Sequence, residues 1–308
     1  MKHDVRLLIP ALLLFFPLGS SGQSSRLTSV DKVGDGVWMA RTDQGSNASW
    51  FLLGEEVVAV DTGSDVATGK ALLEKIHETA GKPVRFVVIT HAHGDHAGGV
   101  GPFVSAGAQV ICHESAAAAL APLVQQPKAA KAALLALSER LAFFGGPRRA
   151  VIYFVGPAHT AGDLVVLLPE DKVLFSGDVA LNGRTPYMRS PDVNPREWEN
   201  LLRRLAQLDV EKVVPGHGTI GTRQALADTF TYVQKVNELA RMMVLENVPD
   251  DLIEPRLHQP GSGVEAAAIT PDLIANIRAA MHAEKAGAAT PKPTLTPKPV
   301  VTPAEKRG

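Results

Sequence analysis

The feature that most constrains this chain is the apolar run Val84–Thr90, which leads directly into a histidine-rich loop. A continuous apolar run is typical of a strand that is covered on both faces. In extended backbone His91 and His93 project to the same side, whereas Asp95 and His96 follow a turn and point elsewhere. This spacing predicts that the first pair binds one metal ion and that the second pair faces another.

Three further candidate ligands each follow an expected strand and have Gly or Pro neighbours. They are His159, Asp178 and His217. Polar side chains at the carboxyl ends of strands gather where binding sites are common. Imidazole and carboxylate donors suit zinc and also bind iron or manganese. The one cysteine, Cys112, excludes a thiolate-rich zinc site and an intramolecular disulfide.

With 45% hydrophobic and 20% charged residues, the composition is that of a globular protein and excludes a chain that is disordered throughout. The formal net charge is -1. Both ends of the chain are basic, so the body between them is acidic. Because nucleic-acid surfaces need clustered Lys and Arg, we expect a small-molecule substrate and no nucleic-acid partner.

Residues 1–22 have the pattern of an export signal. A positively charged start, Met1–Arg6, precedes the apolar run Leu7–Leu18 and the small residues Ser20–Gly22. The apolar run is shorter than the roughly 20 residues that a membrane span needs. We therefore expect a cleaved signal peptide, no stable membrane span, and a periplasmic or secreted protein.

Hydrophobic periodicity and turn residues predict one mature domain over 23–285, in which strands and helices alternate. Residues 23–30 are expected to be a polar leader, and the Pro-, Thr- and Lys-rich residues 286–308 a disordered tail. The pattern indicates an α/β or α+β fold whose sheets are covered by helices. Expected strands are 37–41, 49–53, 57–60, 84–90, 109–111, 151–155, 164–168, 172–175 and 212–214, of which 164–168 and 172–175 are expected to pair as a hairpin across 169–171. Expected helices are 65–80, 114–121, 128–144, 195–208, 222–246 and 271–285.

Taken in order, the motifs of this chain resemble those of the metallo-β-lactamase-fold hydrolase superfamily. They are Val60-Asp61-Thr62-Gly63, the His91–His96 cluster, His159, Gly177-Asp178 and Gly216-His217-Gly218. The resemblance covers nearly the whole mature domain and implies a four-layer αββα sandwich with the site at one edge.

The resemblance also implies a role for each candidate ligand. One metal ion would be bound by His91, His93 and His159, and a second by Asp95, His96 and His217. Asp178 is similar to a carboxylate that bridges both ions. Asp61 is similar to a residue that orients a ligand histidine, as metal-bound imidazoles generally require. A turn cap is the alternative role for Asp61.

The chemistry that the resemblance implies is hydrolysis at a site with two zinc ions. Two cations about 3.5–4 Å apart share a water molecule and lower its pKa towards 7. The bridging hydroxide attacks a carbonyl-type substrate, which is an amide, a thioester or an ester. Asp95 or Asp178 orients this nucleophile and handles its proton, so these two are the expected catalytic residues.

Other functions stay open on the same scaffold. His93 stands where di-iron oxidoreductases of the superfamily usually carry Glu, and Asp178 stands where the best-known zinc β-lactamases carry Cys. Asp178 favours the thioesterase, lactonase and phosphodiesterase branches, whereas the predicted export favours a β-lactamase that acts on β-lactam antibiotics. A mononuclear-iron redox enzyme and a non-catalytic metal-binding protein are further alternatives. The complete set of candidate ligands speaks against the last of these.

The loop after Asp178 contains Arg184, Tyr187 and Arg189 among Gly and Pro residues. Such a loop is compatible with substrate contact and equally with simple solvation. The sequence alone leaves both interpretations open.

Overall fold

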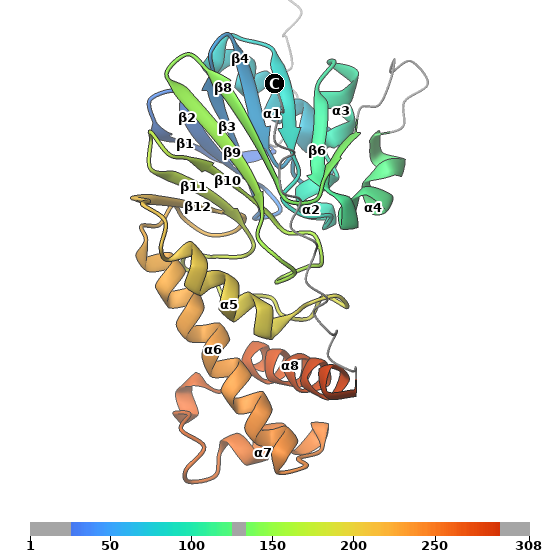
Figure 1. Cartoon of the computed structure of the whole chain (residues 1–308), viewed down its shortest axis with the longest axis vertical. Helices are drawn as coiled ribbons and strands as arrows, with labels where there is room; N and C mark the ends of the chain where they lie inside the picture. The colour runs from blue at the N-terminus through green and yellow to red at the C-terminus, as the bar shows by residue number, and fades with distance from the viewer. Residues whose placement is uncertain (1–25, 125–133, 290–308) are drawn as a thin grey trace, which may run out of the picture.

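A computed structural model describes residues 26–124 and 134–289, whose strands form two sheets (Figure 1). Within these residues the first sheet has 7 strands in the order β1-β2-β3-β4-β5-β6-β7. Strands β1 to β4 pair antiparallel, and β4 to β7 pair parallel. The strands are Leu27–Gly34 (β1), Val37–Thr42 (β2), Asn47–Leu53 (β3), Glu56–Val60 (β4), Val84–Val88 (β5), Gln109–His113 (β6) and Leu134–Leu137 (β7).

The second sheet has 5 strands among the described residues, in the order β12-β11-β10-β9-β8. Strands β8 to β11 pair antiparallel, and β11 and β12 pair parallel. The hairpin that was expected across 169–171 is confirmed, because β10 pairs with β11 there. The strands are Arg140–Gly145 (β8), Arg148–Phe154 (β9), Leu164–Leu168 (β10), Val173–Gly177 (β11) and Lys212–Pro215 (β12).

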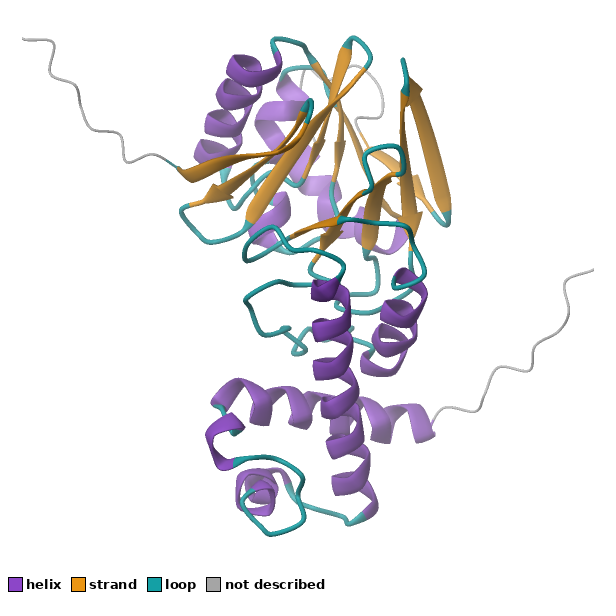
Figure 2. Ribbon diagram, turned by 90° about the vertical axis from the view of Figure 1, so that its left-hand side faces the viewer, coloured by secondary structure: helices purple, strands orange, loops and turns teal. Residues whose placement is uncertain are grey.

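Helices cover the outer face of each sheet (Figures 1 and 2). Helices α1, α3 and α4 pack on the first sheet, and α5 and α6 pack on the second. The helices are Val66–Ala80 (α1), Gly94–Ala97 (α2), Val100–Ser105 (α3), Glu114–Val124 (α4), Pro195–Leu205 (α5), Gln224–Leu245 (α6), Ile253–Leu257 (α7) and Pro271–Ala289 (α8), with short 3-10 helices at Asp250–Leu252 and Ala266–Ala268.

Alternating side chains explain why the strands are apolar on both faces. In β4, Val57 and Ala59 pack against the helices of the first sheet, whereas Val58 and Val60 pack between the two sheets. Because successive side chains of a strand point to opposite faces, each sheet contributes to two apolar layers. The buried residues therefore form one cluster between the sheets and one under each helical layer. The expected αββα sandwich is confirmed.

The ends of helix α1 show how local sequence sets an element. The side chain of Asp65 accepts a hydrogen bond from the Thr68 backbone N–H, which caps the first turn. Gly81 ends the helix in the left-handed conformation, with φ 63°. The helix expected over 65–80 is thus confirmed within one residue.

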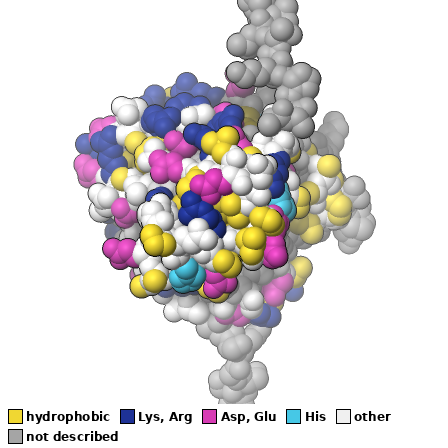
Figure 3. Space-filling view, turned by 90° about the horizontal axis from the view of Figure 1, so that it is seen from below, with side chains coloured by type: hydrophobic (Ala, Val, Ile, Leu, Met, Phe, Trp, Pro, Cys, Tyr) yellow, Lys and Arg dark blue, Asp and Glu magenta, His cyan; other side chains and the backbone are white. Residues whose placement is uncertain are grey.

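The C-terminal helices extend beyond the sandwich, where α8 crosses α6 (Figures 1 and 2). The Arg196 guanidinium of α5 forms hydrogen bonds of 2.8 Å with both carboxylate oxygens of Glu284 in α8. Seen from this end of the molecule, basic, acidic and hydrophobic side chains are intermixed on the surface (Figure 3). Among the described residues, no helix has the length and apolar character needed to cross a membrane.

Two expectations about secondary structure were wrong. The helix expected over 128–144 is not present in its described part, because residues 134–137 and 140–145 form strands β7 and β8. Strand β7 extends the first sheet beside β6, and β8 extends the second beside β9. Pairing at a sheet edge overrides the helix propensity of this Ala- and Leu-rich segment. The polar leader expected over 23–30 is also wrong from Leu27 onward, where β1 begins.

The predicted end segments fall mostly outside the described residues. The signal peptide over 1–22 lies wholly outside them. The tail expected from Ala286 overlaps helix α8, which continues to Ala289, so residues 286–289 are helical. The remainder of the predicted tail, 290–308, lies outside the described residues.

Candidate metal centre

The candidate ligands lie at the carboxyl ends of strands from both sheets. His91 and His93 follow β5, and Asp95 and His96 lie in the short helix α2. His159 follows β9, Asp178 follows β11 and His217 follows β12. The structure brings all of them together, as three overlapping groups whose ligand atoms lie within 4.8 Å of one another. These groups are His91, His93 and His159; His91, His96 and Asp178; and Asp95, His96 and His217.

The first group consists of imidazoles alone. The Nδ1 atom of His93 lies 3.1 Å from Nε2 of His91 and 3.0 Å from Nε2 of His159. His91 and His159 are each 1% exposed. Three ring nitrogens therefore face one small space.

The second group combines imidazole and carboxylate. The Nε2 atoms of His96 and His217 lie 3.2 Å apart. Oδ2 of Asp95 lies 3.0 Å from Nε2 of His217 and 3.6 Å from Nε2 of His96. This arrangement offers two nitrogen donors and one oxygen donor.

Asp178 lies between the two groups. Its Oδ2 atom is 3.6 Å from Nε2 of His159 and 3.6 Å from Nε2 of His217. Its Oδ1 atom is 3.6 Å from Nε2 of His96 and is buried without a hydrogen-bond partner among the described residues. A buried carboxylate oxygen without a partner is costly, so this atom fits a site that binds a cation.

In the imidazoles whose Nε2 atom faces the cluster, the other ring nitrogen, Nδ1, is hydrogen-bonded to the protein. Nδ1 of His159 lies 2.9 Å from the Tyr187 carbonyl, and Nδ1 of His217 lies 3.0 Å from the Gly45 carbonyl. A carbonyl oxygen can only accept, so in these two rings Nδ1 carries a proton, and in the neutral form of either ring the lone pair is on Nε2. That lone pair points into the cluster.

Asp61 holds a third ring in the same way. Its Oδ2 atom lies 2.9 Å from Nδ1 of His96 and also accepts from the Thr90 hydroxyl. That hydroxyl lies 3.0 Å from Nδ1 of His91, which extends the chain of hydrogen bonds to a fourth ring. Asp61 is a non-glycine residue with φ 60°, and such strain collects at functional sites. The expectation that Asp61 orients a histidine agrees with this contact.

His93 is turned the other way. Its Nδ1 atom faces the cluster, and its Nε2 atom lies 3.1 Å from the hydroxyl of Ser190. Ser190 is 4% exposed. The hydroxyl can accept a hydrogen bond from Nε2–H, which leaves the lone pair of His93 on Nδ1.

Burial and charge set different protonation states in the two groups. Burial lowers the pKa of His159 to about 4 and lowers the pKa of His91 and of His93 as well. These three rings are therefore neutral at neutral pH and have free lone pairs. Burial also opposes protonation of His96, but the Asp178 and Asp61 carboxylates outweigh it and raise its pKa to about 10.

The same carboxylates act on the remaining two candidates. Burial opposes protonation of His217, but its hydrogen bond to Asp95 and the charge of Asp178 raise its pKa. Burial would raise the pKa of Asp95, but the hydrogen bond from His217 and the charge of His96 lower it below its usual range. In the group of Asp95, His96 and His217, carboxylates thus compensate the positive charge of the protonated imidazoles.

A glycine permits the close approach of these groups. A Cβ atom on Gly216 would lie 2.2 Å from Oδ1 of Asp178 and 2.8 Å from Cε1 of His96. Real Cβ contacts are not that short, so any larger residue would displace one of the two side chains. The Gly216-His217 sequence therefore serves the packing of the site as well as its ligands.

The cluster lies at the floor of a cavity of about 580 Å³. Arg184 and Tyr187 line this cavity, so two of the three loop residues singled out in the sequence face it. Arg189 does not line it and instead donates a hydrogen bond of 2.8 Å to Asp272 in α8. No described side chain forms an ion pair with Arg184.

Three of the groups that hold the imidazoles were not found from the sequence. They are the carbonyls of Gly45 and Tyr187 and the hydroxyl of Ser190. Every residue has a carbonyl, so no residue type marks the first two. Ser190 follows the loop after Asp178, and its nearness to that motif is the only signal in the sequence.

The donor set fits a divalent transition-metal ion. Neutral imidazoles and carboxylates are ordinary ligands of zinc, iron and manganese. In a metal-binding histidine, the ring nitrogen that faces away from the metal is typically hydrogen-bonded to the protein. The partnerless Oδ1 of Asp178 agrees with a cation at this place. Cys112 contributes nothing to it, because this residue is fully buried in β6 against the helical layer.

Residues 41–217 match the family model described as the metallo-beta-lactamase superfamily. A metallo-beta-lactamase type 2 of Elizabethkingia meningoseptica is 24% identical over 233 residues, which are 72% of this chain and 91% of that protein. A metallo-beta-lactamase type 2 of Bacillus cereus is 27% identical over 214 residues, which are 65% of this chain and 80% of that protein.

Solved structures agree with this match. The metallo-beta-lactamase from Pontibacter korlensis has a TM-score of 0.59 and 28% identity, and the likeness covers 68% of this chain and 99% of that one. The metallo-beta-lactamase FIM-1 from Pseudomonas aeruginosa, in its mono-zinc form, has a TM-score of 0.58 and 26% identity over 67% of this chain and 95% of that one. Because the family model spans more than half of the sequence and the solved structures share the fold, the chain belongs to the metallo-beta-lactamase superfamily.

Proposed function

We propose that this chain is a zinc-dependent hydrolase that acts on a carbonyl-type substrate, which is an amide, a thioester or an ester. The observation that carries the proposal is the convergence of imidazole nitrogens and carboxylates on one space at the floor of an open cavity. A catalytic metal site needs donors that are free of protons and a path for substrate; the neutral imidazoles of one group, the ionised Asp95 and the cavity meet these needs.

In this proposal two ions are held by side chains that already lie close together. His91, His93 and His159 would hold one ion and Asp95, His96 and His217 the second, and Asp178 lies between the two groups. Zinc is favoured because the donors are nitrogen and oxygen atoms around a small space. Iron and manganese accept the same donors and are the alternatives.

Divalent ions in such a site polarise a carbonyl oxygen and lower the pKa of water towards 7. Asp95 lines the cavity, and its lowered pKa keeps the carboxylate ionised, so that it accepts a hydrogen bond from the attacking water and sets its direction. Asp178 also lines the cavity and lies between the two groups, so its carboxylate would hold the attacking water in place. These two carboxylates are the proposed catalytic residues.

Arg184 favours a substrate that carries a negative charge. Arg184 lines the cavity, and its guanidinium forms no ion pair with any of the described residues. Such a guanidinium can bind a carboxylate through two parallel hydrogen bonds. Carbonyl substrates with a carboxylate are therefore the class to test first.

A β-lactam is a second candidate substrate within this class. It is a cyclic amide, and the named relatives and solved structures are called metallo-beta-lactamases. The observation that leaves the wider class open is Asp178, since it stands where the best-known zinc β-lactamases carry Cys.

The test is a substrate panel with metal control. Zinc-loaded protein is assayed with a chromogenic cephalosporin, a thioester, a lactone and a phosphodiester, before and after removal of metal with a chelator. We expect turnover of at least one carbonyl substrate, loss of turnover with the chelator, and recovery with zinc. Turnover of the phosphodiester alone would contradict the proposed substrate class. Recovery with iron but not zinc would contradict zinc as the metal of the site.

We also propose that the chain is exported and acts in the periplasm or outside the cell. The proposal is supported by the charged start, apolar run and small residues of 1–22. Expression of the full chain followed by N-terminal sequencing of the exported protein tests it. A mature N-terminus close to residue 23 is the expected result, and an uncleaved chain retained in the cytoplasm would contradict it.

A further inference from the structure

The segment Pro186–Ser190 holds two of the candidate ligands from outside. The carbonyl of Tyr187 accepts from Nδ1 of His159 at 2.9 Å, and the hydroxyl of Ser190 lies 3.1 Å from Nε2 of His93. The orientation of both rings thus depends on where this segment lies.

Helix α8 holds this segment through one side chain, Asn276. Its Oδ1 atom accepts from the backbone N–H of Met188 at 3.1 Å, and its Nδ2 donates to the carbonyl of Pro186 at 2.7 Å. These two bonds bracket Tyr187. Asn276 and Met188 are both 0% exposed, so water cannot replace either bond without entering the core.

The orientation of the Asn276 amide is itself determined. The Met188 N–H can only donate and the Pro186 carbonyl can only accept, which fixes the places of Oδ1 and Nδ2, and Nδ2 also donates to the Tyr232 hydroxyl of α6 at 2.9 Å. An amide side chain that exchanges two hydrogen bonds with a backbone segment acts like a neighbouring strand. It therefore restricts rotation of the peptide groups on both sides of Tyr187.

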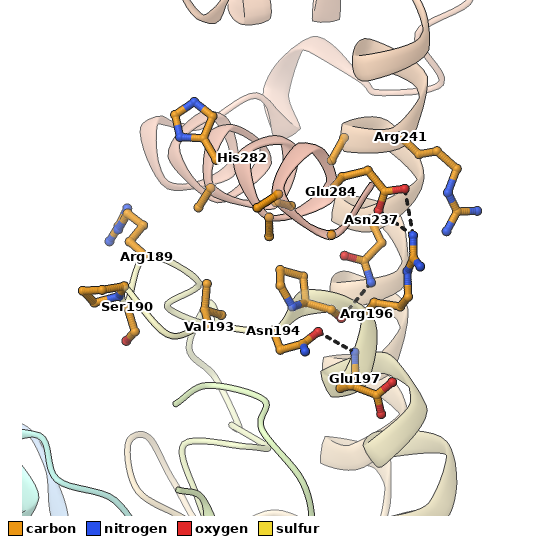
Figure 4. Close-up of a pocket in the computed structure, with 18 residues that line it drawn as sticks. Arg189, Ser190, Val193, Asn194, Arg196, Glu197, Asn237, Arg241, His282 and Glu284 are labelled. Carbon is orange, nitrogen blue, oxygen red and sulfur yellow. Dashed lines mark hydrogen bonds and ion pairs between the residues drawn. The ribbon is translucent and has the colours of Figure 1, made fainter. Parts of the chain in front are cut away.

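Packing alone does not hold this segment against α8. A cavity of about 690 Å³ lies between them, with Arg189 and Ser190 on the loop side and His282 on the helix side (Figure 4). Besides Asn276, the 2.8 Å bond from Arg189 to Asp272 joins the segment to α8, and Met188 lies in an apolar cluster that includes residues of α8. Because part of the segment borders open space, directed hydrogen bonds fix its position together with the packing of Met188.

We propose that Asn276 is a positioning residue of the metal centre, which acts through Pro186–Ser190 on the rings of His159 and His93. The inference rests on the proposed function, because it presumes that these rings bind metal. It assigns a role to α8, a helix that lies beyond the segment matched by the family model.

The test compares zinc affinity of Asn276→Ala, Asn276→Asp and a matched control by competition with a chromogenic chelator. The control is Asn237→Ala in α6, whose amide donates to the Pro195 carbonyl and to Glu199 and does not contact the segment (Figure 4). Loss of a group that orients a metal-binding histidine weakens metal binding by about tenfold to a hundredfold. We expect a loss near the lower end for both Asn276 variants and none for Asn237→Ala.

Asn276→Asp keeps the size of the side chain but replaces the donor toward Pro186 with an acceptor. It therefore separates the lost hydrogen bond from a packing defect, and it serves where Asn276→Ala fails to fold. Equal zinc affinity of Asn276→Asp and wild type in folded protein would overturn the inference.

A second readout does not need zinc. In the metal-free protein, the Nδ1–H proton of His159 is followed by NMR, together with that of His217, which the Gly45 carbonyl holds without help from α8. We expect faster exchange with solvent for His159 in Asn276→Asp and no change for His217. Unchanged exchange at His159 would contradict the inference, whereas wild-type protein that binds no zinc would contradict the proposed function instead.

Discussion

At the scale of single residues, Gly216 limits how closely Asp178 and His96 can pack. A methyl group there would overlap Oδ1 of Asp178, so we expect Gly216→Ala to displace this carboxylate. Because Asp178 lies between both groups of candidate ligands, zinc affinity should fall by about tenfold or more, measured by chelator competition.

Gly94→Ala is the matched control for this prediction. It adds the same methyl group within the histidine-rich loop, but into open space with no atom within 4 Å. Its zinc affinity should stay near the wild-type value. If both alanine variants bind zinc equally well, the close approach at Gly216 does not matter to the site.

Arg184 is the residue that should separate charged from neutral substrates. Since Arg184 lines the cavity and forms no ion pair with any of the described residues, Arg184→Ala should raise KM for a carboxylate-bearing substrate by roughly tenfold. The value of kcat should change less, because the reacting groups are untouched. KM for the methyl ester of the same substrate should not change; an equal rise for both substrates would exclude a charge effect.

At this scale, the sequence was sufficient to predict the side chains with distinctive chemistry. The spacing from His91 to His96 indicated a metal site, and the strand ends indicated His159, Asp178 and His217. The structure brings all of them together. The groups behind them, such as the Tyr187 carbonyl and the Ser190 hydroxyl, could not be predicted. They belong to backbone or to a common residue, and only tertiary structure brings them to a histidine.

At the scale of elements, Arg148 connects the two sheets at the end away from the metal centre. Its guanidinium forms two 2.7 Å bonds with Asp171 in the β10–β11 turn. It also donates at 2.7 Å to the carbonyls of Leu52 in β3 and Asp35 in the β1–β2 turn. We expect Arg148→Ala to lower the free energy of unfolding by about 2 kcal/mol, as measured by urea denaturation.

The neighbouring residue, Arg149, provides a control for the loss of stability in Arg148→Ala. Arg149 forms a longer ion pair, 3.5 Å from Glu170, and both side chains are exposed by 40% or more. Arg149→Ala should therefore cost less than about 1 kcal/mol. Arg148→Lys should recover only part of the loss, because an ammonium group cannot make paired bonds to Asp171 and still reach both carbonyls. Equal losses for the two alanine variants would contradict a special role for Arg148.

Elements whose own residues mark where they begin and end were predicted well. Elements that depend on pairing with another strand were not. The capped helix over 65–80 and the hairpin across 169–171 carry their own start and stop residues. By contrast, β7 and β8 have helix-forming sequences, and they are strands because β6 and β9 offer them partners. Strand β1 is polar enough to read as a leader, yet it pairs with β2 at the edge of the first sheet.

At the scale of the whole molecule, the αββα sandwich followed from the resemblance, whereas the contact of α8 with the site did not. Helix α8 reaches the site through Asn276 and the segment before Ser190. These residues are 86 or more positions apart in the sequence, and no local pattern marks them as partners. Such contacts become visible only when the chain is folded.

Residues 290–308 should be dispensable for the metal centre. This stretch is rich in Pro, Thr and Lys and has few apolar residues with which to form a core. A chain that ends at Ala289 keeps all of α8, so its zinc content and its unfolding midpoint should equal those of the full chain. A drop in either would show that the stretch packs on the domain.

The metal content of the purified protein tests the proposed centre most directly. Elemental analysis after zinc loading and removal of loosely bound metal should give about two zinc ions per chain, because seven ligands exceed the roughly four of one tetrahedral zinc. His91→Ala should lose at least one ion, whereas His77→Ala, an exposed histidine in α1, should lose none. A wild-type chain without stoichiometric metal, or a ratio that His91→Ala leaves unchanged, would contradict the proposal.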